Sequence, residues 1–579
     1  MRIKLLRLYS SPEIFKPIDF TDGINLIMGE KVEDESVKKG KKTNGVGKSM
    51  CIEFINFCLL KKTSDSRVSK IPLDKFMEDT QIILDLEINS NYIKITRTKQ
   101  KPDNPTIVKD GVETEFSSIE DANQYLKELL FSNVENATLG FREFLGPFVR
   151  DEESEYKDIL SCYDLSKRIP PSVKPHAFLF GFDISIINGI EKLFKEIEKV
   201  NTHKLQLQKS LTENKTRKIR DVKAVLNSLN DDLRKIDTAL ESFKTNEAYE
   251  VMQEDLGKIQ LEIENLRARQ TALKYELRKV KSFPSLEVIK RKEIEIIYEQ
   301  FKSGLGEIVS KSIDEVVGFK EKIDEFQKRL LVEKVASLEE ELDIVTTKLQ
   351  NLENSKVDKL KVIDQKGVLK DIKNGYAIYH QKRDSYSYLQ NTYEAYDKAD
   401  SDWKKLRLEK DQMFLKLDAQ IFDARTIIGN FNDTIVEIHS YIMDSNEASF
   451  DIKTVNESKS KQILSFDMRI DDDGSHSIDR TKVFIYDLAL LFNEYTNKRH
   501  PKFLIHDNIF DVDQDTLIKS LNYLSRKESQ KFQYILTLNR DKIENEEQSK
   551  LLELDIKEHR VANFTKKDRF LYGDKYSEV

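Results

Sequence analysis

The sequence predicts an α/β protein with a head split between the two ends of the chain and a long antiparallel α-helical coiled coil inserted between its lobes. Two motifs and the composition predict it. A glycine-rich loop follows an apolar strand near residue 45, and an apolar strand ending in an aspartate lies at 503–507. Charged residues make up 34% of the 579 residues, with 19 glycines and 11 prolines, which is typical of long exposed helices.

These patterns divide the chain into successive segments. We expect an N-terminal head lobe at 1–185, a first coiled-coil arm at 186–283, a short helical elbow at 284–323, a returning arm at 324–445 and a C-terminal head lobe at 446–579. Arms that fold back on each other would bring the two ends of the chain together in one head.

Composition narrows the class of protein. No apolar run is long enough to span a bilayer, and the first residues read as a strand rather than a signal peptide, so we expect no membrane contact. The three cysteines form no framework, which fits a reducing compartment, so we expect a cytoplasmic location. Cys51, Cys58 and Cys162 form no C-x-x-C pair, which argues against a disulfide framework or a zinc site. The net charge of −7 gives no global sign of nucleic-acid binding, so any DNA contact would need local basic patches.

The glycine-rich loop has the residue types of a phosphate-binding P-loop. Its glycines would let backbone N–H groups turn toward phosphate oxygens, while Lys48 would reach the terminal phosphates and Ser49 would hold Mg²⁺. The residues expected to bind the nucleotide are Asn44, Gly45, Val46, Gly47, Lys48, Ser49 and Met50. The strand before them is expected at Ile24–Met28 and the helix after them at Ser49–Leu60.

The spacing of this loop departs from the usual pattern. The first glycine of the pattern would fall at Lys42, whereas Gly29 closes the strand and a charged insert, Lys31–Thr43, follows it. We interpret Gly29 as the displaced first glycine and the insert as a surface loop. A chance glycine–lysine loop is the alternative, and the flanking strand and helix favour the phosphate site.

The middle of the chain carries leucine-rich series spaced by three and four, at 226–243, 252–280 and 331–352. This is the seam of a left-handed coiled coil, and the core of a helical bundle is the alternative. Gly304, Gly306 and Gly318 are expected to interrupt the elbow. Two glycines and a row of tyrosines predict a break or a bundle-like section at Asp364–Asp397.

Both head lobes show strand patterns. The N-terminal lobe is expected to hold strand Arg2–Tyr9 and an antiparallel set at Gln81–Ile88, Tyr92–Thr98 and Thr106–Val108. In the C-terminal lobe, the expected elements are strands Phe450–Ile452 and Ser465–Ile470, helix Thr481–Tyr495, strand Phe503–His506, helix Gln514–Leu524 and strand Phe532–Leu538. Alternating strands and helices favour a parallel core.

Three segments of the C-terminal lobe carry a family resemblance. Phe503–Asp507 resembles the Walker B strand of P-loop ATPases, and Gly474–Arg480 before the helix Tyr486–Phe492 looks like an ABC signature region. Gln533–Arg540 is similar to the switch strand of SMC proteins. Order and spacing agree, so the chain resembles the SMC-like ABC ATPases over roughly Met1–Phe182 and Phe450–Val579.

The resemblance implies ATP and Mg²⁺ as cofactors, with Ser49 and Asp507 as metal ligands. It also implies a homodimer of ATP-bound heads, in which signature residues Ser475, Ser477 and Arg480 of one chain meet the nucleotide of the other. The insert, the Ile505-His506-Asp507 strand and the Thr537-Leu538-Asn539 switch resemble the short-armed ATPase subunit of bacterial three-component ABC systems. That subfamily implies an ATPase that senses DNA without sequence readout and controls accessory and effector proteins in anti-phage defence.

Two alternatives stay open: a DNA repair or chromosome-maintenance ATPase, and a nucleotide-dependent structural clamp with negligible hydrolysis. The motifs also depart from the family. Asn508 stands where ABC ATPases usually place the glutamate that polarises water, and Asn539 stands where the switch histidine is usual. Asp511 or Asp513 is expected to replace the missing acid, and ATP turnover is expected to be slow or triggered by DNA.

Candidates for DNA contact are few. Arg150 follows a segment where ABC heads carry a glutamine loop, and no glutamine stands there; a structural ion pair with the acidic run Asp151–Glu153 is the alternative. The first arm adds a basic cluster of Lys215, Arg217, Lys218 and Arg220. Such runs are usually solvated helix faces, and no aromatic-interleaved basic motif accompanies them.

Overall fold

The computed structural model describes residues 1–30, 45–132, 134, 138–162, 171–212, 217–242, 250–281, 313–363, 368–457, 461–471, 476–543 and 550–572. The chain divides into two compact units. The first consists of Met1–Glu198 and Lys404–Val579, and the second of Lys199–Trp403. The architecture is mixed α/β, as the sequence predicts.

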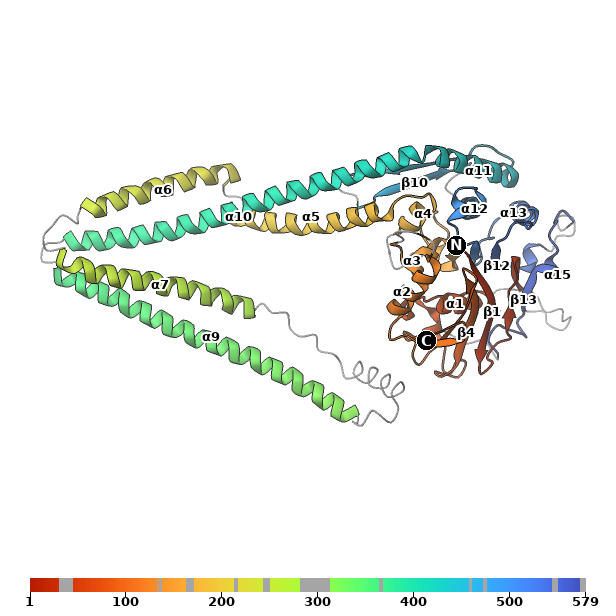
Figure 1. The fold of residues 1–579 in the computed structure, drawn as a ribbon, viewed down its shortest axis with the longest axis horizontal. Coiled ribbons are helices and arrows are strands. Elements are labelled where there is room, and N and C mark those ends of the chain that lie inside the picture. The colour runs from red at the N-terminus through yellow and green to blue at the C-terminus, as the bar shows by residue number, and fades with distance from the viewer. Residues whose placement is uncertain are drawn as a thin grey trace. The chain divides into compact units, whose positions relative to one another are not determined.

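A five-stranded sheet in the first unit draws strands from both ends of the chain (Figure 1). Its strands, in spatial order, are β13 (Arg560–Phe564), β3 (Gly23–Gly29), β12 (Gln533–Asn539), β11 (Phe503–His506) and β8 (Val149–Arg150). Every pairing in this sheet is parallel, which confirms the predicted parallel core. Its central strands read as near-continuous apolar runs and are buried, as expected for a parallel sheet.

A six-stranded sheet in the same unit is antiparallel throughout. In spatial order it contains β2 (Ile18–Asp19), β1 (Ile3–Ser11), β4 (Gln81–Ile88), β5 (Asn91–Thr98), β6 (Thr106–Lys109) and β7 (Val112–Glu115). The predicted antiparallel set is confirmed. A separate antiparallel pair consists of β9 (Ser449–Thr454) and β10 (Leu464–Arg469).

Eight helices lie wholly within the described part of the first unit. They are α1 (Lys48–Cys58), α2 (Ile119–Leu130), α3 (Phe141–Leu145), α4 (Lys174–Leu179), α11 (Arg425–Met443), α12 (His476–Phe492), α13 (Gln514–Arg526) and α15 (Ile556–His559). Helix α1 is almost entirely buried, and its buried residues include the polar Lys48, Glu53 and Asn56 as well as apolar side chains. Helix α12 begins at His476, before the expected start at Thr481, so the presumed signature residues Ser477 and Arg480 are helical.

The second unit consists of long helices (Figure 1). It contains α6 (Ile219–Ser242), α7 (Glu250–Lys281), α9 (Ile313–Ile363) and the adjoining parts of α5 (Ile184–Leu211) and α10 (Val368–Asp423). Helix α7 packs on α9 through a seam with Leu273, Leu338 and Val345 buried. Ion pairs Arg267–Glu353 (2.8 Å) and Lys281–Glu339 (2.6 Å) run beside the seam in antiparallel order.

The elbow and the predicted break are only partly described. Residues 282–312 of the elbow and 364–367 of the break lie outside the described residues. Helix α9 runs through Gly318, so the interruption expected at that glycine is wrong. Helix α10 likewise runs through Gly375, and its Tyr376 and Tyr379 pack on Leu240 of α6. Helical glycine costs about 1 kcal/mol, which a long packed helix absorbs.

Candidate nucleotide site

The candidate site lies at the carboxyl edge of the parallel sheet. Ligands of open α/β sheets bind at this edge, where strand ends and loops leave polar groups exposed. Strand β3 ends at Gly29, and its neighbour β12 ends at Asn539, which is paired with Gly29 in the register. Asp507 follows β11, and the acidic run Asp151–Glu153 follows β8. The fold therefore brings both ends of the chain to one edge.

The glycine loop enters helix α1 through left-handed backbone. Gly45 has φ 79° and Gly47 has φ 103°, a region that side chains rarely adopt. A Cβ at Gly47 would lie 2.6 Å from Phe570 Cβ, so no larger residue fits there. Gly47 is the N-cap of α1 and provides no side-chain cap, which leaves first-turn N–H groups for another acceptor.

The remaining loop residues contribute in different ways. Asn44 lies outside the described residues. Val46 and Met50 have buried side chains in the core, so they could meet a ligand only through the main chain. The displaced glycine has a clear steric role, because a Cβ at Gly29 would lie 3.0 Å from Asn539 Oδ1 and 3.1 Å from Lys48 Nζ.

The Lys48 side chain lies at this edge and contacts the side-chain amide of Asn539. Its Nζ donates a hydrogen bond of 2.5 Å to Asn539 Oδ1 on the neighbouring strand. Burial lowers the pKa of the Lys48 ammonium from its ordinary value, and nearby carboxylates, Asp507 first among them, oppose that shift. The amide oxygen holds the ammonium in place without neutralising its charge, which suits a lysine that receives an anion.

Asp507 is buried beside the loop. Thr537 Oγ1 donates a 2.7 Å hydrogen bond to its Oδ1. Burial raises the pKa of Asp507 to about 6, although hydrogen bonds from Thr537 and Ser49 favour the charged form, and the Glu152 carboxylate raises it further. A buried carboxylate next to a serine hydroxyl offers the hard oxygen ligands that Mg²⁺ prefers, with substrate phosphates and water completing its shell.

Asn508 occupies a strained backbone position after Asp507. Its φ is 57°, and its N–H donates to Thr537 Oγ1 at 2.8 Å. Its side-chain Nδ2 donates to Glu152 Oε1 at 3.3 Å, and Glu152 Oε2 lies 3.5 Å from Ser49 Oγ. Glu152 is not among the residues that the sequence predicts near the site. The acidic run that directly follows strand β8 is the sequence feature that could have indicated it.

The two acids expected to replace the missing glutamate are engaged elsewhere. Asp511 pairs with Lys542 at 2.9 Å, and that hydrogen bond lowers the pKa of Asp511. Asp513 is the N-cap of α13, where Oδ1 accepts from Thr516 N at 3.0 Å and Oδ2 accepts from Thr516 Oγ1 at 2.7 Å. Capping stabilises a helix start by about 1 kcal/mol, so Asp513 has a structural role here.

The prediction that Arg150 contacts DNA or phosphate is wrong. Arg150 is 0% exposed, and its Nε and Nη2 donate to Asp487 at 2.6 and 3.0 Å. Its guanidinium also donates to the carbonyl oxygens of Ile159 and Ser161, at 2.6 and 3.2 Å. The alternative partner, the acidic run that follows it, is also wrong, because the side chain points inward to α12.

The signature residues lie on or near the start of α12. Ser475 lies outside the described residues, and Ser477 is half-buried in the first turn. Arg480 Nη1 donates to the backbone oxygen of Asn508 at 2.5 Å, and its guanidinium lies 5.4 Å from the ring centroid of Tyr156. Arg480 therefore contacts the site of its own chain in this structure.

The basic cluster of the first arm belongs to the second unit. Lys215 lies outside the described residues, and Arg217 is half-buried. Lys218 and Arg220 are exposed, with Arg220 Nε 3.5 Å from Asp221. Lys218 directly precedes α6 and Arg220 lies in its first turn, so both cations are accessible to phosphate as well as to solvent.

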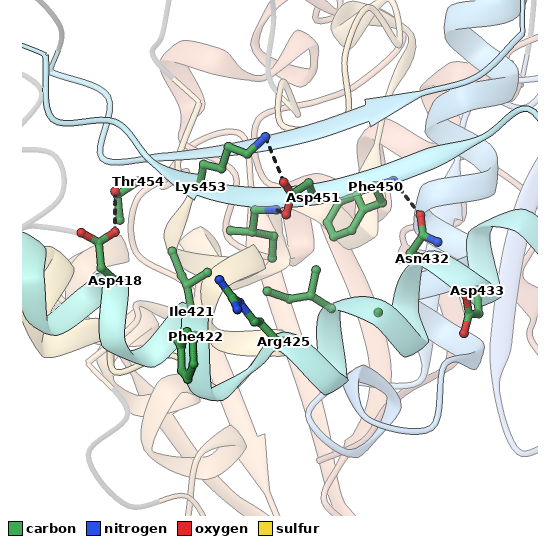
Figure 2. Close-up of a pocket in the computed structure, with 13 residues that line it drawn as sticks. Asp418, Ile421, Phe422, Arg425, Asn432, Asp433, Phe450, Asp451, Lys453 and Thr454 are labelled. Atoms are coloured by element: carbon green, nitrogen blue, oxygen red, sulfur yellow. Dashed lines mark hydrogen bonds and ion pairs between the residues drawn. The ribbon is translucent and has the colours of Figure 1, made fainter.

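A separate groove of about 950 Å³ lies between α10, α11 and β9 (Figure 2). Four of its polar side chains form two pairs: Thr454 donates to Asp418 at 2.7 Å, and Lys453 pairs with Asp451 at 2.9 Å. None of the residues predicted from the sequence as site residues lines this groove.

The candidate site has few other features of a metal centre. Within the described ranges, no group of three or more His, Cys, Asp and Glu side chains could hold a metal ion by itself. A magnesium site here would rely on the nucleotide for most of its ligands.

The described helices include none with the length and apolar character needed to cross a membrane.

Comparison with known proteins gives a family model that matches part of the chain and a relative that matches most of it. A family model described as "Uncharacterised protein conserved in bacteria (DUF2326)" matches residues 436–573. The chain is 25% identical over 580 residues to "Uncharacterized protein YydD" of Bacillus subtilis strain 168, with 94% of each protein covered.

Solved structures similar to this chain include SMC heads. One is the Smc head domain with a coiled coil and joint from Pyrococcus yayanosii, with TM-score 0.35, 14% identity, and 95% of this chain and 94% of that chain covered. Another is the Smc head domain with an extended coiled coil, bound to the C-terminal domain of ScpA, from Pyrococcus furiosus, with TM-score 0.31, 13% identity, and 93% and 90% covered. TM-scores of this size add nothing to what the sheet and loop show by themselves.

Proposed function

We propose that this chain is an SMC-like ATPase that binds Mg·ATP at the carboxyl edge of its parallel sheet. The observation that carries the proposal is the meeting of Lys48 and Ser49, from one end of the chain, with Asp507 and Asn539 from the other. Lys48 Nζ and Asn539 Oδ1 are 2.5 Å apart, and Asp507 lies close enough to Lys48 to oppose the lowering of its pKa.

The roles follow from the chemistry of each side chain. Loop N–H groups and Lys48 would bind the phosphates. Gly47 and Gly29 allow the close packing of the loop against Phe570 and of the strand end against Asn539 and Lys48. Ser49 and Asp507 would hold Mg²⁺, which neutralises charge on the β- and γ-phosphate oxygens when bound. Burial raises the pKa of Asp507 to about 6 and the Glu152 carboxylate raises it further, whereas a divalent cation bound here would favour the charged form.

The finer proposal concerns control. The motifs resemble those of bacterial three-component ABC systems, so we propose that DNA triggers the ATPase and that nucleotide-dependent pairing of two heads controls effector proteins in anti-phage defence. Asn508 and Asn539 replace a usual acid and a usual histidine, which favours slow basal turnover. The same two amides favour the second candidate, a clamp held shut by ATP with negligible hydrolysis.

An ATP-hydrolysis assay of the full chain, with and without linear double-stranded DNA, tests this. We expect low basal turnover, stimulation by DNA, and loss of turnover in Lys48→Ala. Lys62→Ala is the matched control, since Lys62 is exposed and pairs with Glu120 at 3.0 Å. Turnover that survives Lys48→Ala would contradict the site. ATP-dependent dimerisation without turnover, with or without DNA, would favour the clamp.

A further inference from the structure

The site has a carboxylate in a place that the sequence motifs do not indicate. Glu152 lies on a short turn, Glu152–Ser154, that follows strand β8. Its Oε1 accepts from Asn508 Nδ2 at 3.3 Å, and its Oε2 lies 3.5 Å from Ser49 Oγ. Glu152 therefore lies between the expected metal-binding hydroxyl and the residue that follows Asp507, although it is far from both in the sequence.

The backbone that carries Glu152 is fixed from several sides. The Arg150 carbonyl accepts from Asp507 N at 3.0 Å, and Tyr156 Oη lies 3.1 Å from the same oxygen and 2.6 Å from the Asp507 carbonyl oxygen. The Arg150 side chain is buried against Asp487. The turn itself closes through Ser154 N to Asp151 O at 3.2 Å and Glu155 N to Glu152 O at 3.1 Å. The pairing of β8 with β11, which sets Arg150 opposite His506, thus holds the segment that begins at Asp151 beside Asp507 and Asn508.

The neighbouring acids point away from this position. Asp151 Oδ2 accepts from Lys61 Nζ at 3.1 Å, and Glu153 Oε2 lies 3.4 Å from the same ammonium. Glu152 turns the other way and stays exposed at the edge of the sheet. An exposed carboxylate has room for a water molecule. By contrast, Asp511 is paired with Lys542 and Asp513 caps the start of α13.

We infer that Glu152 is the catalytic carboxylate that orients the attacking water and accepts its proton. In this step the water oxygen forms a bond to the γ-phosphorus, and the bond from that phosphorus to the β–γ bridging oxygen breaks, its electron pair leaving with ADP. The water proton passes to Glu152 and then to solvent. Asn508 holds the carboxylate through its amide. Contacts of 3.3–3.5 Å are typical of a catalytic group before substrate binds.

This inference rests on the proposed nucleotide site, so its test measures binding and hydrolysis separately. Glu152→Gln removes the charge, yet the Gln oxygen can still accept from Asn508 Nδ2. Glu155→Gln is the matched control, because it makes the same change at an exposed residue three positions along the same segment. Binding is measured by titrating the full chain with a fluorescent ATP analogue and Mg²⁺, and hydrolysis by single turnover of radiolabelled ATP with and without DNA.

We expect Glu152→Gln to bind the analogue within about threefold of wild type and to hydrolyse ATP about a hundredfold more slowly. Glu155→Gln should match wild type in both. Hydrolysis by Glu152→Gln within about threefold of wild type would overturn the inference. Loss of Mg²⁺-dependent binding in Glu152→Gln would overturn it too, because Glu152 would then be a metal ligand.

The two proposals fail in different ways. Wild type that binds the analogue but never hydrolyses ATP, with or without DNA, would overturn the role of Glu152 and leave the nucleotide site standing. Wild type that does not bind the analogue at all would overturn the nucleotide site itself.

Discussion

Lys48 Nζ and Asn539 Oδ1 lie 2.5 Å apart, although the two residues are 491 positions apart in the chain. The parallel pairing of β12 with β3 produces this contact, because its register sets Asn539 opposite Gly29. The lysine that we propose to receive the terminal phosphates is thus held by the last residue of β12. Any movement of β12 would change where the ammonium lies.

Changing that amide to an acid should weaken nucleotide binding. In Asn539→Asp, a carboxylate beside Lys48 would neutralise the ammonium and repel phosphate. A charge-assisted hydrogen bond contributes about 1.5–3 kcal/mol, so we expect ATP affinity to fall by about tenfold or more. Titration with a fluorescent ATP analogue measures it. Asn227→Asp, on the exposed face of α6, should bind like wild type; equal affinity in both variants would contradict the role of Asn539.

The loop glycines should differ in their tolerance of a methyl group. Gly47 has φ 103° and a Cβ there would lie 2.6 Å from Phe570 Cβ, whereas Gly45 has nothing within 4 Å. Both substitutions should lower the free energy of unfolding by about 1–2 kcal/mol, because alanine disfavours left-handed backbone, but Gly47→Ala adds a steric clash. We expect Gly47→Ala to lower the thermal unfolding midpoint further than Gly45→Ala and to abolish ATP binding. Equal midpoints would show that the loop can move away from Phe570.

The buried ion pair between Arg150 and Asp487 should be intolerant of a single substitution. The exposed fractions of their side chains are 0% and 1%, and His506 Nε2 also lies 2.9 Å from Asp487 Oδ2. Arg150→Met would leave the buried Asp487 carboxylate without its partner, which should lower the free energy of unfolding by about 3–5 kcal/mol. The double variant Arg150→Met, Asp487→Leu should recover part of that loss. Denaturant unfolding followed by circular dichroism measures it; a neutral single variant would contradict the pairing.

Stability should fall with falling pH because His176 is buried as the neutral ring. Burial lowers the pKa of His176 to about 3, and the charge of Arg150 adds to that shift. Unfolded histidine has a pKa of about 6.5, so between these values the unfolded chain binds the extra proton. The free energy of unfolding should therefore drop by up to about 1.4 kcal/mol for each pH unit below 6.5.

Thermal unfolding midpoints at pH 7.5 and 5.5 check this prediction. Wild type should unfold at a lower temperature at pH 5.5, and His176→Asn should show a smaller difference between the two values. His203→Asn, at an exposed position of α5, should keep the wild-type difference. A difference unchanged by His176→Asn would mean that other groups set the pH dependence.

The parts of the fold that rest on local pattern could be predicted from the sequence. Apolar runs marked β11 and β12, and loop glycines marked the turn into α1, because strand burial and positive φ leave a signal within a few residues. The polar partners could not be predicted this way. Glu152 and Asn508 are 356 positions apart, and Arg150 and Asp487 are 337 apart. Such pairs follow from strand order, which no short window of sequence encodes.

The same reason explains the wrong predictions. Arg150 stands beside three acids in the sequence, so a local pair or an exposed cation was the natural interpretation. In the fold, strand β8 turns its side chain toward α12. Gly318 looked like an interruption because glycine is a poor helix former, yet packing of the long helix outweighs a cost of about 1 kcal/mol.

If Lys48, Ser49 and Asp507 form one Mg·ATP site, calorimetric titration of the full chain with a non-hydrolysable ATP analogue should show saturable binding of one nucleotide per chain. We expect this binding to weaken by about tenfold or more when EDTA removes Mg²⁺. We expect no binding in Lys48→Ala and no effect of EDTA in Asp507→Asn. Wild-type affinity in Lys48→Ala, or no binding by wild type, would contradict the Mg·ATP site.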